Sequence, residues 1–169
     1  MNVLSIDPGL MGTGVALWTN EGSALDWERI ELPQNVWTYT PRGRTWQDRS
    51  QDCLMWLNYI YKVYNVIDTY CEWPQYFMGA IGHSATVRGD IHKLTYLIGG
   101  IAHLATYVHT GNMHLVPVVE WKGQLPKQVV INRIKQIYQK ANLNINSIDI
   151  KSHGWDALGI GLYVKGVFH

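Results

Sequence analysis

The sequence predicts an α/β fold, with a mixed five-stranded sheet and helices on both of its faces. Three short apolar stretches separated by turn residues come first. Segments of strand length then alternate with segments of helical periodicity. The first arrangement is typical of antiparallel strands, and the second is typical of parallel strands joined by helices. We interpret residues 1–169 as one domain, because this length fits a single sizeable core.

The N-terminal stretch organises the rest of the chain. Residues 2–7 predict a short buried strand that ends at Asp7, and after a Pro-Gly turn residues 12–18 predict its antiparallel partner. A weak alternation over residues 25–32 predicts a third strand at the edge of the sheet. We expect residues 33–43, which contain two prolines and a glycine, to form a loop.

The next segments predict a helix and then a strand. Thr45 with Asp48 three residues later resembles a capping box, so a helix should begin there. Residues 66–71 predict a strand that Glu72 closes, and Pro74 stops regular structure.

A loop over residues 75–89 is expected to lead into a helix over residues 90–109, with Asp90 able to cap it. Gly99 and Gly100 lie inside this helix, where each glycine costs about 1 kcal/mol relative to Ala. We therefore expect another helix to approach closely there, from the same chain or from a second subunit.

The C-terminal part predicts one more strand and two helices. The strand covers residues 113–119, and Pro126 suits the first turn of the helix that follows. Ser152 is expected to cap the last helix, with Asp156 near its start.

Composition excludes several classes of protein. A net charge of +1 argues against a simple basic coat for nucleic acid. No long apolar run predicts a membrane span, and the N-terminus lacks the pattern of a secretory signal. Cys53 and Cys71 do not make a disulfide framework, so a cytoplasmic location is expected.

Three acidic residues occupy positions that the predicted fold would bring together. Asp7 ends the first strand, Glu72 ends the fourth, and Asp156 follows His153 at the start of the last helix. Carboxylates held this close favour protons or cations, and hard oxygen ligands suit Mg²⁺ or Mn²⁺. Each residue also has a structural explanation: Asp7 as a turn residue, Glu72 as a solvated strand end, and Asp156 as a carboxylate that the helix dipole stabilises.

These residues resemble the motifs of the RuvC family of Holliday-junction resolvases, within the RNase H-like superfamily. The resemblance covers most of the chain and rests on four stretches: IDPGLMGTGVAL, CEWPQYF, WKGQLPKQVV and SHGWDALGIGLY. It implies a homodimer that cuts two opposing strands of a four-way or branched DNA junction by two-metal phosphodiester hydrolysis. It also implies two Mg²⁺ ions for each active site, for which Mn²⁺ would substitute, no nucleotide cofactor, and a bacterial or phage-infected cell.

Residue roles follow from the same resemblance. The implied metal ligands and catalytic residues are Asp7, Glu72, His153 and Asp156, and the implied catalytic lysines near the scissile phosphate are Lys122 and Lys127. The implied DNA contacts are Tyr76, Phe77, Arg88, Lys93, Lys122 and Lys127, and the implied dimer-interface residues are Thr95, Gly99, Ala102 and Thr106.

The sequence departs from the family pattern in three places, one of which is the late start of the helix that follows Trp73 and Pro74. The segment between Lys122 and Lys127 is short and lacks a Gly-x-Gly, and Trp155 replaces a small residue beside Asp156. These departures indicate a divergent, phage-type branch. Two alternatives remain open: a non-catalytic nucleic-acid-binding module on the same fold, and an actin-like or sugar-kinase-like phosphotransferase, which would need a second lobe.

Overall fold

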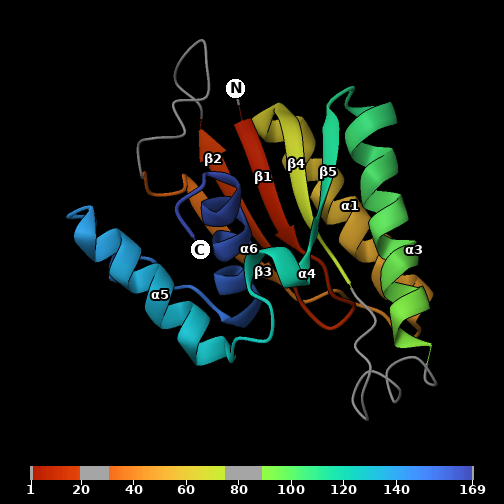
Figure 1. Cartoon of the computed structure of the whole chain (residues 1–169). Helices are drawn as coiled ribbons and strands as arrows, with labels where there is room; N and C mark the ends of the chain where they lie inside the picture. The colour runs from red at the N-terminus through yellow and green to blue at the C-terminus, as the bar shows by residue number, and fades with distance from the viewer. Residues whose placement is uncertain (1, 20–30, 75–88, 169) are drawn as a thin grey trace.

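A mixed five-stranded sheet forms the centre of the computed structural model, which describes residues 2–19, 31–74 and 89–168 (Figure 1). The strand order is β3-β2-β1-β4-β5. β1, β2 and β3 pair antiparallel, whereas β4 and β5 run parallel to β1. The bounds of the strands are β1 Asn2–Asp7, β2 Thr13–Thr19, β3 Asn35–Tyr39, β4 Val66–Trp73 and β5 Asn112–Pro117. The predicted fold class is confirmed.

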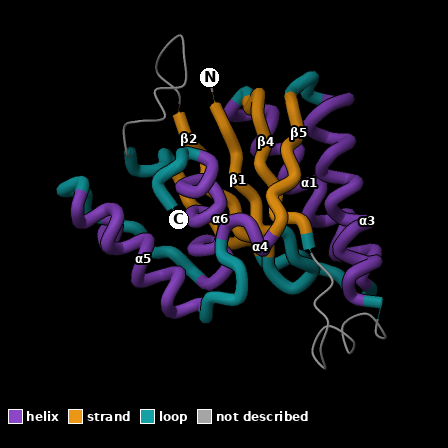
Figure 2. The backbone as a smooth tube through the Cα atoms, in the orientation of Figure 1, coloured by secondary structure: helices purple, strands orange, loops and turns teal. Residues whose placement is uncertain are grey.

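Helices cover both faces of this sheet (Figure 2). The helices are α1 Trp46–Tyr64, α3 Asp90–His103, α4 Val118–Trp121, α5 Lys127–Lys140 and α6 Ser152–Val164. A π-helical turn, Leu104–Val108, extends α3, and a 3-10 turn covers Ile145–Ser147. None of the helices within the described ranges is long and apolar enough to cross a membrane.

Side chains of β1 point alternately to the two faces of the sheet, and each face has its own hydrophobic core. Leu4 and Ile6 pack with residues of α1 and α3, whereas Val3 packs on the other face with residues of α5 and α6. A strand in the middle of a sheet that is covered on both faces is expected to be apolar on both sides. β1 is therefore fixed firmly, and with it the position of Asp7 at its end.

The third strand is not where the sequence pattern placed it. It covers Asn35–Tyr39, inside the predicted loop 33–43, whereas residues 31 and 32 are not in a strand and residues 25–30 lie outside the described residues. Val36 packs into one core and Trp37 into the other, so the strand is stabilised by burial on both faces.

The starts of two helices show one correct and one wrong prediction. The Thr45 hydroxyl accepts from the Asp48 amide and the Asp48 carboxylate accepts from the Thr45 amide, which confirms the capping box. Ser152 is not a cap: α6 begins at Ser152, and Lys151 before it makes no side-chain capping bond. The Gly154 amide instead donates to Thr38 Oγ1 of β3 at 3.1 Å, so the sheet satisfies an N-terminal amide of α6.

Candidate active site

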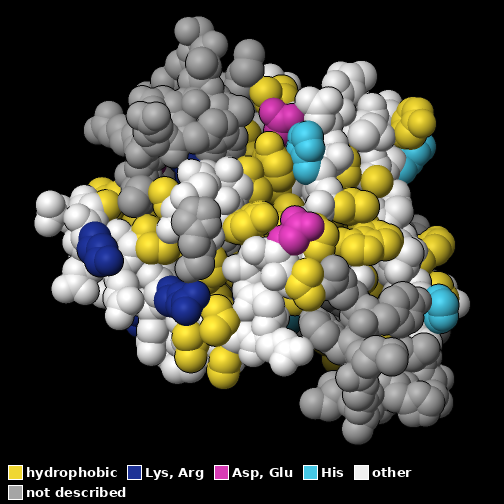
Figure 3. All heavy atoms as spheres, in the orientation of Figure 1, with side chains coloured by type: hydrophobic (Ala, Val, Ile, Leu, Met, Phe, Trp, Pro, Cys, Tyr) yellow, Lys and Arg dark blue, Asp and Glu magenta, His cyan; other side chains and the backbone are white. Residues whose placement is uncertain are grey.

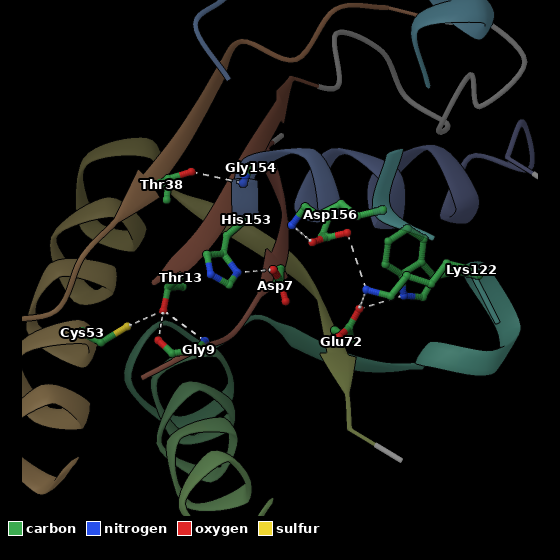
Figure 4. Close-up of polar contacts among 12 residues, drawn as sticks. Asp7, Gly9, Thr13, Thr38, Cys53, Glu72, Lys122, His153, Gly154 and Asp156 are labelled. Atoms are coloured by element: carbon green, nitrogen blue, oxygen red, sulfur yellow. Dashed lines mark hydrogen bonds and ion pairs between the residues drawn. The ribbon is translucent and has the colours of Figure 1, made fainter. Parts of the chain in front are cut away.

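Two parallel strands and one helix bring the acidic residues together. β1 and β4 are neighbours, and Ile6 of β1 pairs with Cys71 of β4, so Asp7 and Glu72 follow at the same edge of the sheet. The start of α6 lies at this edge and contributes His153 and Asp156. Figure 4 shows the three carboxylates turned toward one another.

Asp7, His153 and Asp156 form a group able to hold one metal ion. Each residue offers a ligand atom, and these atoms lie within 4.8 Å of one another. Asp7 and Asp156 are 7% and 6% exposed, and His153 Nδ1 lies 2.7 Å from Asp7 Oδ2. Buried carboxylates at this spacing fit a divalent ion such as Mg²⁺ or Mn²⁺.

Glu72 lies beside this group but is held by nitrogen donors. Lys122 Nζ lies 3.1 Å from Glu72 Oε2 and 3.5 Å from Asp156 Oδ1, so its ammonium bridges two of the carboxylates. The Trp121 indole donates to the same Glu72 oxygen at 3.0 Å. Lys127 Nζ lies 2.5 Å from Asp156 Oδ2. Both lysines that the resemblance implied therefore contact the carboxylates directly.

The carboxylates are difficult to ionise together. Burial raises the pKa of Asp7, although the hydrogen bond from His153 opposes this rise. Burial and the nearby Asp7 raise the pKa of Glu72 to about 7. Burial alone would lower the pKa of Lys122, but the surrounding carboxylates outweigh it and the pKa rises. The hydrogen bond to Asp7 raises the pKa of His153. Such a cluster favours a bound cation.

Glycines in the first hairpin allow α6 to approach so closely. A Cβ at Gly14 would collide with the backbone carbonyl of His153, and a Cβ at Gly12 would lie 2.7 Å from the His153 ring. The glycines of the stretch GLMGTG therefore let the start of α6 pack directly on the hairpin, which brings His153 within reach of Asp7.

The other implied DNA contacts lie outside the cluster of Asp7, Glu72, His153 and Asp156, or outside the described ranges. Tyr76, Phe77 and Arg88 lie outside the described residues. Lys93 lies in the first turn of α3, with its Nζ 3.2 Å from Asp90 Oδ1.

The predicted dimer residues follow one stripe of α3 and its π-helical extension. Thr95 and Gly99 are exposed, whereas Ala102 and Thr106 are partly exposed. A Cβ at Gly99 would meet no described atom within 4 Å, whereas a Cβ at Gly100 would clash with Leu54 of α1. Gly100 thus serves a close contact within the chain, and the Gly99 stripe remains open to a partner.

Trp121 is the residue that sequence reasoning missed. It is 3% exposed, and its ring packs directly on Gly159 of α6. A Cβ added at Gly159 would lie only 2.5 Å from the Trp121 ring. The combination of a tryptophan next to Lys122 and a glycine three residues after Asp156 is the only sign of this contact in the sequence.

Comparison with known proteins identifies the fold. No protein-family profile matches the chain, and no curated protein matches its sequence. Solved structures share its architecture, among them two of Thermus thermophilus RuvC. A Thermus thermophilus RuvC structure aligns with a TM-score of 0.65 and 16% identity, over 96% of this chain and 92% of that one. Thermus thermophilus RuvC in complex with a Holliday junction substrate aligns with a TM-score of 0.66 and 14% identity, over 99% and 98%.

The sheet and helices have an RNase H-like arrangement, and the fold of this chain is the RuvC fold over nearly its whole length. This confirms the fold that the resemblance implied.

Proposed function

We propose that this protein is a metal-dependent endonuclease that resolves four-way DNA junctions by paired symmetric nicks. The observation that carries the proposal is the cluster of Asp7, Glu72, His153 and Asp156, at the ends of two parallel strands and the start of α6. The RuvC fold supports it, because one of the similar structures holds a Holliday junction substrate. Such a substrate belongs with the DNA in the cytoplasm of a bacterial or phage-infected cell.

Asp7, His153 and Asp156 would hold one divalent ion, and Glu72 would join Asp7 around a second. Bound Mg²⁺ or Mn²⁺ would activate the attacking water and stabilise the leaving 3′ oxygen. Lys122 would exchange its contact with Glu72 for one with the DNA phosphate, where its charge offsets the charge that grows in the transition state.

Lys127 is the second proposed phosphate contact. Its side chain is 40% exposed, so it can reach a strand that passes over Asp156. It is also the first residue of α5, and lysine or arginine side chains lie over this helix in Figure 3. Contacts of this kind make DNA binding dependent on salt.

A homodimer would match the two-fold symmetry of an opened junction. Large apolar side chains stand exposed on α1 and α3 and its extension, among them Met55 at 67%, Tyr96 at 60% and Val108 at 50%. These three residues line a groove of about 460 Å³ between the helices. An exposed apolar surface of this kind is typical of a protein interface, and the open stripe at Gly99 adjoins it.

The second candidate is a non-catalytic DNA-binding module. The observation in its favour is that Lys122 and Lys127 already neutralise part of the carboxylate charge, which reduces the need for an ion. This candidate predicts junction binding without metal-dependent cutting.

The test compares cleavage of a synthetic four-way junction with cleavage of a linear duplex in Mg²⁺ and in Mn²⁺. We expect the wild type to cut the junction in preference, and Asp7→Asn, Glu72→Gln and Asp156→Asn each to abolish cutting while junction binding remains. The matched control is Asp68→Asn, which removes a carboxylate from β4 that hydrogen-bonds Asn112 and lies outside the cluster.

Three results would decide against the proposal. Normal cutting by the three site variants would refute the site. Equal cutting of the linear duplex would refute junction selectivity but not the nuclease activity. Junction binding by the wild type with no cutting in either metal would support the non-catalytic module.

A further inference from the structure

A cavity distinct from the groove between α1 and α3 lies beside the β1–β2 turn, on the side of the turn away from the candidate active site. It has a volume of about 330 Å³ and lies between this turn and the first turns of α1 and α3. This size is at the low end for ligand pockets, about 300–1,000 Å³, and suits one small group. The lining residues include Gly9, Met11, Trp46, Arg49, Lys93 and Leu94.

The cavity is suited to an anion. Arg49 Nε is buried and has no hydrogen-bond partner among the described residues. A buried donor without a partner carries a desolvation penalty that a ligand acceptor would remove. Lys93 adds a second positive charge, which Asp90 in the cavity wall partly offsets at 3.2 Å.

The start of α3 adds to this preference. Gly89 precedes the helix in a left-handed conformation, with φ of 68°, and it supplies no side-chain cap. The positive end of the helix dipole therefore faces the cavity region without a capping side chain from Gly89, and the Asp90 carboxylate in the first turn offsets part of it. The start of α1 differs, because its capping box already satisfies it.

One turn of backbone forms a wall of the cavity and also contacts the catalytic cluster. Gly9 lines the cavity, and a Cβ placed on it would lie 3.8 Å from His153 Cε1. The Thr13 hydroxyl donates to the Gly9 carbonyl at 2.9 Å and lies 3.3 Å from Cys53 Sγ, as Figure 4 shows. Cys53 is one helical turn after Arg49 on α1, so these contacts fix Arg49, the turn and His153 relative to one another.

We infer that this cavity binds a backbone phosphate of the DNA strand that is cut, close to the scissile phosphate, with Arg49 as the main donor. The inference rests on the proposed function and adds a positioning contact to it. The apolar walls formed by Met11, which is 72% exposed, and by Trp46 and Leu94 are suited to the attached sugar or base. Holding a neighbouring phosphate would fix the position of the scissile bond over the carboxylates.

The test replaces single phosphates around the cleavage position with neutral methylphosphonates and measures junction binding without divalent ions. For the wild type, we expect one position to weaken binding by about 10-fold or more, the effect of losing a hydrogen bond between charged groups. Arg49→Gln should weaken binding to the unmodified junction by a similar factor. The two changes together should cost no more than either alone, because they remove the same contact.

Two further variants separate this contact from general charge and from folding. Arg44→Gln removes a positive charge from the exposed chain just before α1, outside the cavity lining. It should weaken binding modestly at every position and show no coupling. Arg49→Lys keeps the charge but not the Nε–H donor. It should bind the unmodified junction more weakly than the wild type, because the Nε–H hydrogen bond is lost, and it should keep part of the salt dependence and part of the coupling. It replaces Arg49→Gln if the latter does not fold.

The outcomes distinguish this inference from the proposed function. If the wild type cuts junctions but no methylphosphonate position is coupled to Arg49, the inference is overturned and the proposed function stands. Coupling at one position in a protein that binds junctions without cutting them would support the cavity and refute the nuclease. Coupling at a position far from the cleavage site would also overturn the inference.

Discussion

Trp121→Phe is the substitution that tests the support of Glu72. It removes the indole N–H that donates to Glu72 Oε2 at 3.0 Å and keeps an aromatic ring in the same pocket. Among the described residues, Glu72 would then be held by Lys122 alone, in a contact that competes with metal binding. Loss of an outer-shell hydrogen bond typically costs about 10–100-fold in metal affinity. This is equivalent to roughly 1.4–2.7 kcal/mol.

The chain offers a matched control for this substitution. Trp18 is 4% exposed and donates its indole N–H to Ser5 Oγ at 2.9 Å. Its ring packs against Gly161 of α6, as the Trp121 ring packs against Gly159 two residues earlier. Trp18→Phe therefore removes a similar volume and a similar buried hydrogen bond from the same helix packing, but it touches no carboxylate of the site.

The assay is Mg²⁺ and Mn²⁺ binding by calorimetry, together with thermal unfolding of the metal-free proteins. Both variants should lose about 1–3 kcal/mol of stability from the smaller ring and the lost hydrogen bond. Only Trp121→Phe should also lose metal affinity, by the factor given above. Equal metal affinity in the two variants would refute the proposed role of Trp121.

The pKa shifts and the two glycines of α3 give the remaining predictions. Glu72 has a folded pKa of about 7 against an ordinary 4.5, and the pKa of His153 is also raised, so both groups bind protons more tightly in the folded state. The metal-free protein should therefore lose stability as the pH rises from about 4.5 to above 7, and Mg²⁺ should raise the melting temperature more near pH 8 than near pH 5.5. A metal-free melting temperature that rises over this range would contradict the assignment. Gly99→Leu should keep the fold, because its Cβ meets no atom of the described residues within 4 Å, but it should yield a monomer by analytical ultracentrifugation, because the added side chain would fill the proposed interface. Gly100→Leu should instead lower the stability of the fold, because its side chain would clash with Leu54. If the Gly99→Leu protein is still a dimer, the interface lies elsewhere.

The sequence predicted the parts of the site that depend on strand ends. Asp7 follows an apolar run and Glu72 lies two residues before Pro74, so both could be placed at the ends of strands without knowledge of packing. The parallel pairing of β1 and β4 then brought them to one edge. The start of the helix at Thr45 was also predictable, because a capping box is a local signal.

The sequence did not predict the features that depend on long-range packing. The third strand lies between Pro33 and Pro41, where local breakers hide its alternation, and two separate cores stabilise it. The Trp121 contact requires the close approach of α4 and α6 at Gly159. The position of Lys122 between two carboxylates depends on where α4 ends, which no local pattern specifies.

The most direct test of the proposed function is cleavage of a labelled four-way junction by the wild type and by Asp7→Asn in Mg²⁺. The proposed function predicts two symmetric nicks in opposing strands by the wild type, and unchanged junction binding without cutting by Asp7→Asn. An Asp7→Asn protein that cuts as well as the wild type, or a wild type that binds the junction and cuts neither strand, would contradict it.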